Sequence, residues 1–133
     1  MMTAKRRISA ADGQAALAAW RGGAKERTTT ATSVRFSLEE LTARAPGNSV
    51  EVRVPPFGVT QCIEGPRHTR GTPPNVVETD AVTWLELAQG SLDWSTALAS
   101  SRVQAYGLRA DLSAVLPLWH GTQSSGDESI LDK

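Results

Sequence analysis

The chain has 133 residues, and its 14 basic and 14 acidic side chains give a formal net charge of zero at pH 7. This length fits one domain with a core of its own. Cys62 is the only cysteine, which excludes an internal disulfide and favours a cytoplasmic location. No apolar run approaches the length of a membrane span, so we expect no integral membrane segment.

The charges are unevenly distributed along the chain. Residues 1–30 carry six basic side chains against two acidic ones, and residues 120–133 carry three acidic side chains against one lysine. A basic arm without interleaved aromatic residues is weak evidence for a nucleic-acid or lipid surface, so we expect no nucleic-acid partner. We predict a basic leader with an accessory helix and linker over residues 1–32, a main domain over 33–119 and a disordered acidic tail over 120–133.

The leader contains one signal for a helix. Ser9, with Asp12 three residues on, has the spacing of a modified capping box and predicts a helix over Ala10–Trp20 that the following glycines end. The charged, threonine-rich segment Arg21–Thr32 is typical of a linker.

A second helix signal follows this segment. Ser37 and Glu40 have the spacing of a full capping box, and Phe36 and Leu41 occupy the positions of a hydrophobic staple. We therefore expect a helix that begins at Ser37 and ends before Pro46, although Val34 allows an earlier helical turn.

Strands are predicted next. Val50–Val54 alternates strictly, with three valines on one face and charged side chains on the other. Pro55–Pro56 must form a corner or an edge because proline cannot donate a hydrogen bond to a neighbouring strand. A second strand is predicted over Phe57–Ile63, with one side formed by Phe57, Val59 and Ile63 and the other by Thr60, Cys62 and Glu64. Val76 and Val77 then mark a third strand.

The remaining elements are separated by acidic caps and glycines. Asp80 caps a helix whose apolar residues recur at helical spacing, and Gly90 ends it. Asp93 starts another helix, and Val103–Tyr106 is predicted to be a strand. A last helix is expected over the apolar residues Leu112, Val115 and Leu116, up to the proline that follows.

These elements predict an α+β fold: a four- to five-stranded, mostly antiparallel sheet with helices on one face. Their order resembles the C-terminal half of the sterol carrier protein-like domains. The segment Ser49–Glu78, with PPFGVTQCIEG and HTRGTPPNVVE, is similar to the small bacterial branch of that family. The resemblance covers about Val34–Leu118, and it implies a mixed helix and sheet domain with an apolar cavity.

The loop Glu64–Asn75 gathers polar residues. Arg67 and Arg70 flank His68, and guanidinium groups match carboxylate or phosphate oxygens. The functional interpretations are anion recognition, acid–base catalysis by His68 with Glu64, or a thiol reaction at Cys62 assisted by His68. The structural alternative is that the arginines pair with nearby acids and only hold the connection in place.

Other classes of site are not indicated. Two histidines and one cysteine at unrelated spacings do not predict a metal site, and phosphate-binding glycine motifs are absent from the sequence. We therefore expect no cofactor and favour a non-catalytic protein. An enzyme or enzyme accessory domain that uses the Cys62, Glu64 and His68 loop is the alternative, together with a protein-interaction module.

The leading hypothesis is binding of a small hydrophobic or amphipathic, lipid-like or acyl ligand, with the loop meeting its polar head. Large apolar side chains either pack as a solid core or line a cavity between helices and sheet. The predicted ligand-binding residues are Arg67, His68, Arg70, Asn75, Trp84, Leu85, Leu98, Leu112 and Leu116.

Overall fold

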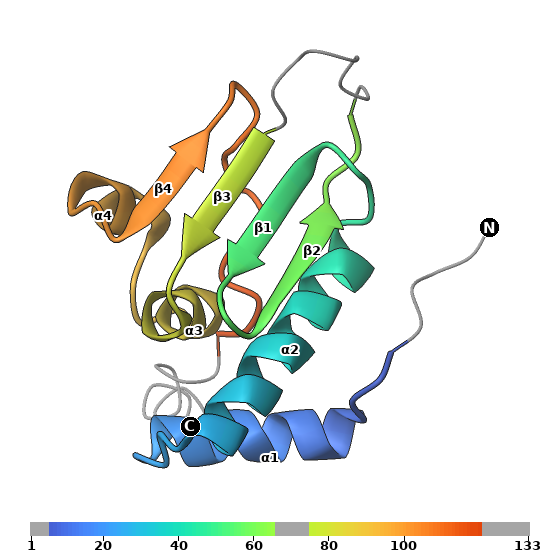
Figure 1. Ribbon diagram of the computed structural model, residues 1–133, viewed down its shortest axis with the longest axis vertical. Helices are drawn as coiled ribbons and strands as arrows, with labels where there is room; N and C mark the ends of the chain where they lie inside the picture. Colours follow the sequence, from blue (N-terminus) through green and yellow to red (C-terminus); the bar gives the residue numbers. More distant parts are fainter. Residues whose placement is uncertain (1–5, 66–74, 121–133) are drawn as a thin grey trace, which may run out of the picture.

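The computed structural model describes residues 6–65 and 75–120. A single four-stranded sheet forms the centre, in the order β2-β1-β3-β4 (Figure 1). β1 pairs antiparallel with β2 and parallel with β3, and β3 pairs antiparallel with β4. This confirms the predicted α+β fold with a mostly antiparallel sheet. The elements are α1 (Ala10–Arg21), α2 (Arg27–Arg44), β1 (Val50–Val54), β2 (Gly58–Cys62), β3 (Asn75–Thr79), α3 (Ala81–Gln89), α4 (Trp94–Ala99) and β4 (Val103–Tyr106).

The strict alternation of β1 gives the sheet one dry and one wet face. Its three valines are fully buried under the helices, whereas Arg53 is exposed on the opposite face and pairs with Glu51 at 2.7 Å. α2 runs alongside β2 and packs against α3, and α1 crosses the lower end of α2, away from the sheet (Figure 1). The core joins the valines of the sheet to leucine and tryptophan side chains of the helices and to Leu112 and Leu118 of the segment after β4.

The predicted helix caps at Ser9, Asp80 and Asp93 are confirmed. Ser9 Oγ accepts from Asp12 N at 3.0 Å, Asp80 Oδ1 accepts from Thr83 N at 2.8 Å, and Asp93 Oδ1 accepts from Thr96 N at 2.9 Å. These bonds satisfy backbone donors that the first turn of a helix leaves without partners. Gly90 ends α3 with φ 88°, a left-handed conformation that costs little without a Cβ atom.

The predicted start of the second helix at Ser37 is wrong. α2 begins at Arg27, so most of the segment predicted as a linker is helical. Ser37 lies inside α2 with its hydroxyl buried, where it donates to Val34 O at 2.8 Å. Packing of α2 against both α1 and the sheet outweighs the low helix propensity of its threonines.

The predicted last helix is also wrong. Leu112 to Leu116 make a turn, in which Asp111 Oδ1 accepts from Ser113 N at 2.9 Å. Short acidic side chains favour such local bonds over helix continuation. The chain then crosses α3, where Ala88 O accepts from Leu118 N at 2.8 Å. The apolar spacing therefore reflects core contacts of a non-helical segment.

The second strand is shorter than predicted, and the side with Thr60 and Cys62 is the one that faces the core. Val50 lies opposite Cys62 and Val52 lies opposite Thr60, so Thr60 and Cys62 share the dry face with the valines. Cys62 is fully buried, whereas 58% of Val59 is exposed.

A buried polar contact joins α2 to α3 through the core. Trp84 Nε1 donates to Ser37 Oγ at 2.7 Å, and both side chains are inaccessible to solvent. An indole N–H buried without an acceptor is costly, so this contact fixes how α2 and α3 face each other.

We predict that Ser37→Ala lowers the free energy of unfolding by about 1–3 kcal/mol, because the Trp84 N–H then lacks its acceptor. Urea unfolding measures this change. Ser95→Ala, which alters an exposed hydroxyl on α4, is the matched control and should change stability by less than about 0.5 kcal/mol. Equal effects of the two substitutions would contradict a structural role for the Ser37–Trp84 bond.

Candidate functional site

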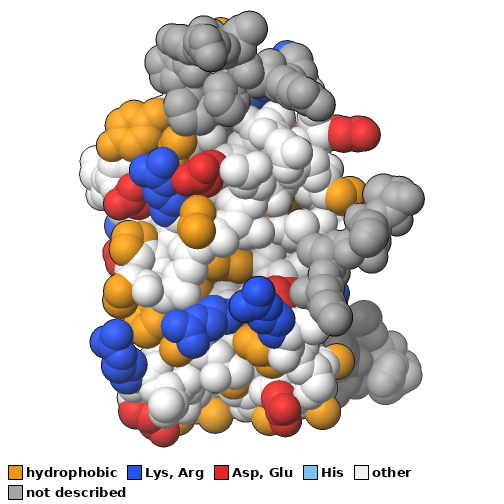
Figure 2. Space-filling model, turned by 45° about the vertical axis from the view of Figure 1, so that its right-hand side comes forward, with side chains coloured by type: hydrophobic (Ala, Val, Ile, Leu, Met, Phe, Trp, Pro, Cys, Tyr) orange, Lys and Arg blue, Asp and Glu red, His pale blue; other side chains and the backbone are white. Residues whose placement is uncertain are grey.

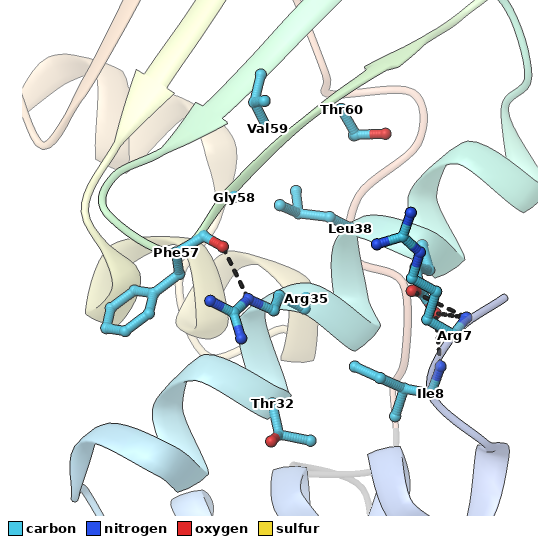
Figure 3. A pocket seen from close by; sticks show the side chains of 10 residues that line it. Arg7, Ile8, Thr32, Arg35, Leu38, Phe57, Gly58, Val59 and Thr60 are labelled. Carbon is cyan, nitrogen blue, oxygen red and sulfur yellow. Dashed lines mark hydrogen bonds between the residues drawn. The ribbon is translucent and has the colours of Figure 1, made fainter.

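A groove of about 660 Å³ lies between α2, the edge strand β2 and the segment that precedes α1 (Figure 3). Its apolar lining includes Ile8, Leu38 and Phe57, and its charged lining consists of Arg7, Arg35 and Glu39. Figure 2 shows basic side chains in a row beside recessed hydrophobic ones on this side of the molecule. The groove therefore combines apolar surface with guanidinium groups.

Two side chains of α2 donate hydrogen bonds to backbone carbonyl groups on the outer edge of β2, one at each end of the groove. Arg35 Nε donates to Phe57 O at 3.0 Å, and Thr42 Oγ1 donates to Gln61 O at 2.9 Å. Backbone groups of alternate residues in an antiparallel strand point to the same edge. The backbone groups of Val59 therefore face the same edge between these two bonds, where Val59 lines the groove.

Gly58 allows α2 to approach β2 closely at the floor of the groove. A Cβ atom on Gly58 would lie 3.1 Å from Leu38 Cδ1, which is closer than ordinary packing allows. Leu38 is only 4% exposed, so it closes the floor and separates the groove from the core.

The third wall comes from residues 6–8, which precede the N-cap of α1. Both oxygens of Glu39 accept from Arg7 N, at 3.2 and 3.3 Å, and Glu39 Oε1 accepts from Ile8 N at 3.3 Å. Arg6 Nη2 pairs with Glu40 Oε1 at 2.6 Å. We call residues 6–8 the N-terminal strap, because these contacts hold its backbone against α2.

Glu40 connects the strap to the end of α2. It accepts from Arg6 on one oxygen and from Arg44 Nε on the other, each at 2.6 Å. Burial raises the pKa of Glu40, but the hydrogen bonds from Arg6 and Arg44 outweigh it, so the pKa lies below its ordinary value.

Three guanidinium groups near the groove have no acidic partner within the described residues. Arg7 and Arg35 line it, and Arg27 Cζ lies 5.5 Å from the centre of the Phe57 ring. Among residues 6–65 and 75–120, no carboxylate lies within 4.0 Å of the charged nitrogens of these arginines. The site is therefore suited to an anion beside an apolar group.

The sequence did not indicate the residues of this groove. Thr32 and Arg35 fall in or beside the segment interpreted as a linker, and Arg7 and Ile8 fall in the leader. A helix extended back to Arg27 would have placed Thr32 and Arg35 one turn apart on the same side. That extension is the one signal that could have found them.

The predicted core-facing ligand residues lie elsewhere. Trp84, Leu85 and Leu112 have no exposed surface, whereas 39% of Leu98 is exposed on α4. Leu116 lines a second groove of about 450 Å³ between the end of α3, the start of α4 and residues 113–120. The structure therefore does not bring these predicted residues together in one cavity.

Of the four polar residues predicted to bind a ligand, only Asn75 lies within the described residues. Arg67, His68 and Arg70 lie outside the described residues, so their role stays a prediction. Asn75 begins β3, where its Nδ2 donates to Ser49 O at 2.9 Å and its Oδ1 accepts from Arg109 N at 3.0 Å. Its amide therefore joins the start of β1 to the turn after β4.

Cys62 is poorly suited to act as a nucleophile. It is fully buried at the end of β2, and this burial raises the pKa of its thiol to about 11. The thiolate is the reactive form of cysteine, and at neutral pH it is scarce here. This argues against the thiol reaction considered from the sequence.

No group of three or more metal-ligating side chains that could hold an ion occurs within residues 6–65 and 75–120. No helix among these residues is long and apolar enough to cross a bilayer.

Comparison with known families agrees with this fold. A family model described as "Bacterial SCP ortholog" matches residues 26–118. The chain belongs to this family of sterol carrier protein-like domains. No curated protein matches the chain.

The limits of the sterol carrier protein-like match coincide with structural features. The match starts at Glu26, the N-cap of α2, and ends at the buried Leu118. It begins before the resemblance seen in the sequence at Val34 and includes the whole of α2. α1 and the N-terminal strap precede the match, although they pack against its helix α2.

We predict that Cys62 reacts with a thiol reagent such as Ellman's reagent at least about 100-fold more slowly in the native protein at pH 8 than in the unfolded chain. A raised pKa and burial both lower the concentration of accessible thiolate. Absorbance at neutral to mildly alkaline pH, with and without denaturant, measures the two rates. Similar rates in both conditions would contradict the buried position of the thiol.

We predict that Glu40→Gln lowers the free energy of unfolding by about 1 kcal/mol at pH 7, because Arg6 and Arg44 lose their shared carboxylate. The pKa of Glu40 is lower in the folded state than in the unfolded state. The ionised carboxylate therefore stabilises the protein fully at a pH above its unfolded-state pKa, and this stabilisation is lost as the pH falls through its folded-state pKa. The difference between variant and native protein should therefore shrink below about pH 4. Urea unfolding from pH 7 to pH 3 tests this, and a difference independent of pH would refute it.

Proposed function

We propose that the protein binds an amphipathic, lipid-like ligand without converting it, and that the groove between α2 and β2 is the site. The observation that carries this proposal is the combination in one groove of an apolar floor at Leu38 and Phe57 with the guanidinium groups of Arg7 and Arg35. An apolar chain gains by leaving water against such a floor, while a polar head keeps its hydrogen bonds at the rim.

Size and family membership support the proposal. A groove of about 660 Å³ has the volume of typical small-molecule sites. The sterol carrier protein-like family is consistent with a lipid-binding role. The groove proposed here, however, lies at a different position from the internal cavity that the resemblance implied.

An internal site would require the core to open. Trp84, Leu85 and Leu112 expose no surface, so a guest between sheet and helices would have to displace them. Close packing makes such displacement costly. The α2–β2 groove needs no such rearrangement, which favours it as the binding site.

The loop between β2 and β3 is a separate candidate for contact with the polar head of the ligand. Arg67, His68 and Arg70 stay candidates for contact with a polar head, and Asn75 fixes the point at which their loop joins β3. Their contribution is testable by substitution, independently of the groove.

We predict that Thr32→Trp abolishes binding of a fluorescent fatty-acid analogue, because the indole fills the groove from α2. Thr32 is half-buried, and Thr28 lies one turn earlier on the same helix without lining the groove. Thr28→Trp is therefore the matched control and should leave binding unchanged. Fluorescence titration of the full chain gives both dissociation constants.

The comparison of the two variants decides the position of the site. Urea unfolding must first show that both remain folded. Equal binding by Thr32→Trp and Thr28→Trp would place the ligand outside the α2–β2 groove. Native mass spectrometry that finds no fatty acid or acyl thioester bound to the unaltered protein would reject the proposed function itself.

A further inference from the structure

We infer that the N-terminal strap determines which ligands the groove accepts: Arg7 adds a second guanidinium to Arg35, so that the site selects single-chain amphiphiles with an oxyanion head over neutral ones. This inference rests on the proposed function, because it names the ligand class of the same groove. It concerns residues 6–8, which lie outside the family match at 26–118.

The strap is held by its backbone and by Arg6, which leaves the Arg7 side chain available to the groove. Glu39 accepts from the backbone N–H groups of Arg7 and Ile8, and Arg6 pairs with Glu40 at 2.6 Å. Arg7 itself lines the groove, and its guanidinium makes no ion pair among the described residues. These contacts fix the backbone of Arg7, and none of the acids in residues 6–65 and 75–120 neutralises its guanidinium charge.

Arg7 and Arg35 approach the groove from different elements. Arg35 projects from α2 toward Phe57, whereas Arg7 projects from the strap toward the side where Leu38 and Thr60 lie (Figure 3). The Arg35 guanidinium uses Nε for the bond to Phe57 O at 3.0 Å, and its terminal nitrogens make no bond within residues 6–65 and 75–120. Both groups therefore keep donors for a ligand.

The charge of the groove favours an anion. Its lining contains two arginines and one acid, Glu39, and that acid is engaged by two backbone N–H groups of the strap. A neutral head such as a hydroxyl would leave the two guanidinium groups without a charged partner. A carboxylate or a phosphate monoester supplies oxygens that match their geometry.

The test compares three ligands of equal chain length: dodecanoate, dodecyl phosphate and dodecanol. Each displaces a fluorescent fatty-acid analogue from the full chain, from Arg7→Gln and from Arg7→Lys. Arg21→Gln on the exposed end of α1 is the matched control, because Arg21 does not line the groove.

We expect the unaltered protein to bind at least one anion more tightly than dodecanol. Arg7→Gln should weaken the binding of that anion about tenfold and leave the affinity for dodecanol unchanged, since one charge-assisted hydrogen bond is lost. Arg7→Lys should recover part of the loss, and Arg21→Gln should change none of the three affinities. The anion that depends more strongly on Arg7 identifies the head group as carboxylate or phosphate.

Two results would overturn the inference, and they are distinguishable. If Thr32→Trp blocks all three ligands but Arg7→Gln leaves the ratio of anion to alcohol affinity unchanged, the groove is the site and the strap does not select the head group. If Thr32→Trp has no effect, the ligand binds outside the groove, and if none of the ligands binds, the proposed function itself fails; the inference fails in either case.

Discussion

The attachment of α2 to the outer edge of β2 sets the geometry on which the candidate site depends. Arg35 and Thr42 donate to the carbonyl groups of Phe57 and Gln61, at the two ends of the strand. An edge strand with unpaired backbone groups is open to pairing with other chains, and side-chain bonds of this kind reduce that exposure. Because the bonds lie at the ends, the space between them stays a groove.

The rotation of α2 about its own axis follows from a second set of contacts. Val34, Ser37 and Leu41 recur at helical spacing and are fully buried, and Ser37 accepts the Trp84 indole N–H at 2.7 Å. With this side turned toward the core, Arg35 and Thr42 necessarily face β2. The buried Ser37–Trp84 bond and the groove are therefore two consequences of one helix orientation.

The sequence predicted those parts of the fold whose signals are local. The cap at Asp80 needs only a side-chain oxygen three residues before a backbone N–H, and the alternation of Val50–Val54 needs only one dry face. The capping-box pattern at Ser37 is equally local, but its hydroxyl serves a residue 47 positions away in the chain. A short stretch of sequence does not show whether such a serine caps a helix or accepts a hydrogen bond from a distant residue in the core.

The site was harder to predict than the fold, because three segments far apart in the sequence form its walls. Arg7 and Ile8, the middle of α2 and the start of β2 meet only once the sheet and helices have packed. The polar loop at 64–75 was predicted to bind a polar head group because its charged residues are adjacent in the sequence. Adjacency in sequence indicates local charge density, whereas a binding groove requires walls from separate elements.

The family match covers only part of this site. Residues 26–118 supply the walls from α2 and β2, while Arg7 and Ile8 of the strap precede the match. Glu39 and Glu40, inside the match, hold the strap in place through its backbone and through Arg6. The shared domain therefore provides the floor of the groove and the attachment of its third wall, but the charge on that wall belongs to a segment outside the domain. The ligand class proposed for this groove therefore depends on residues from both segments and not on the matched domain alone.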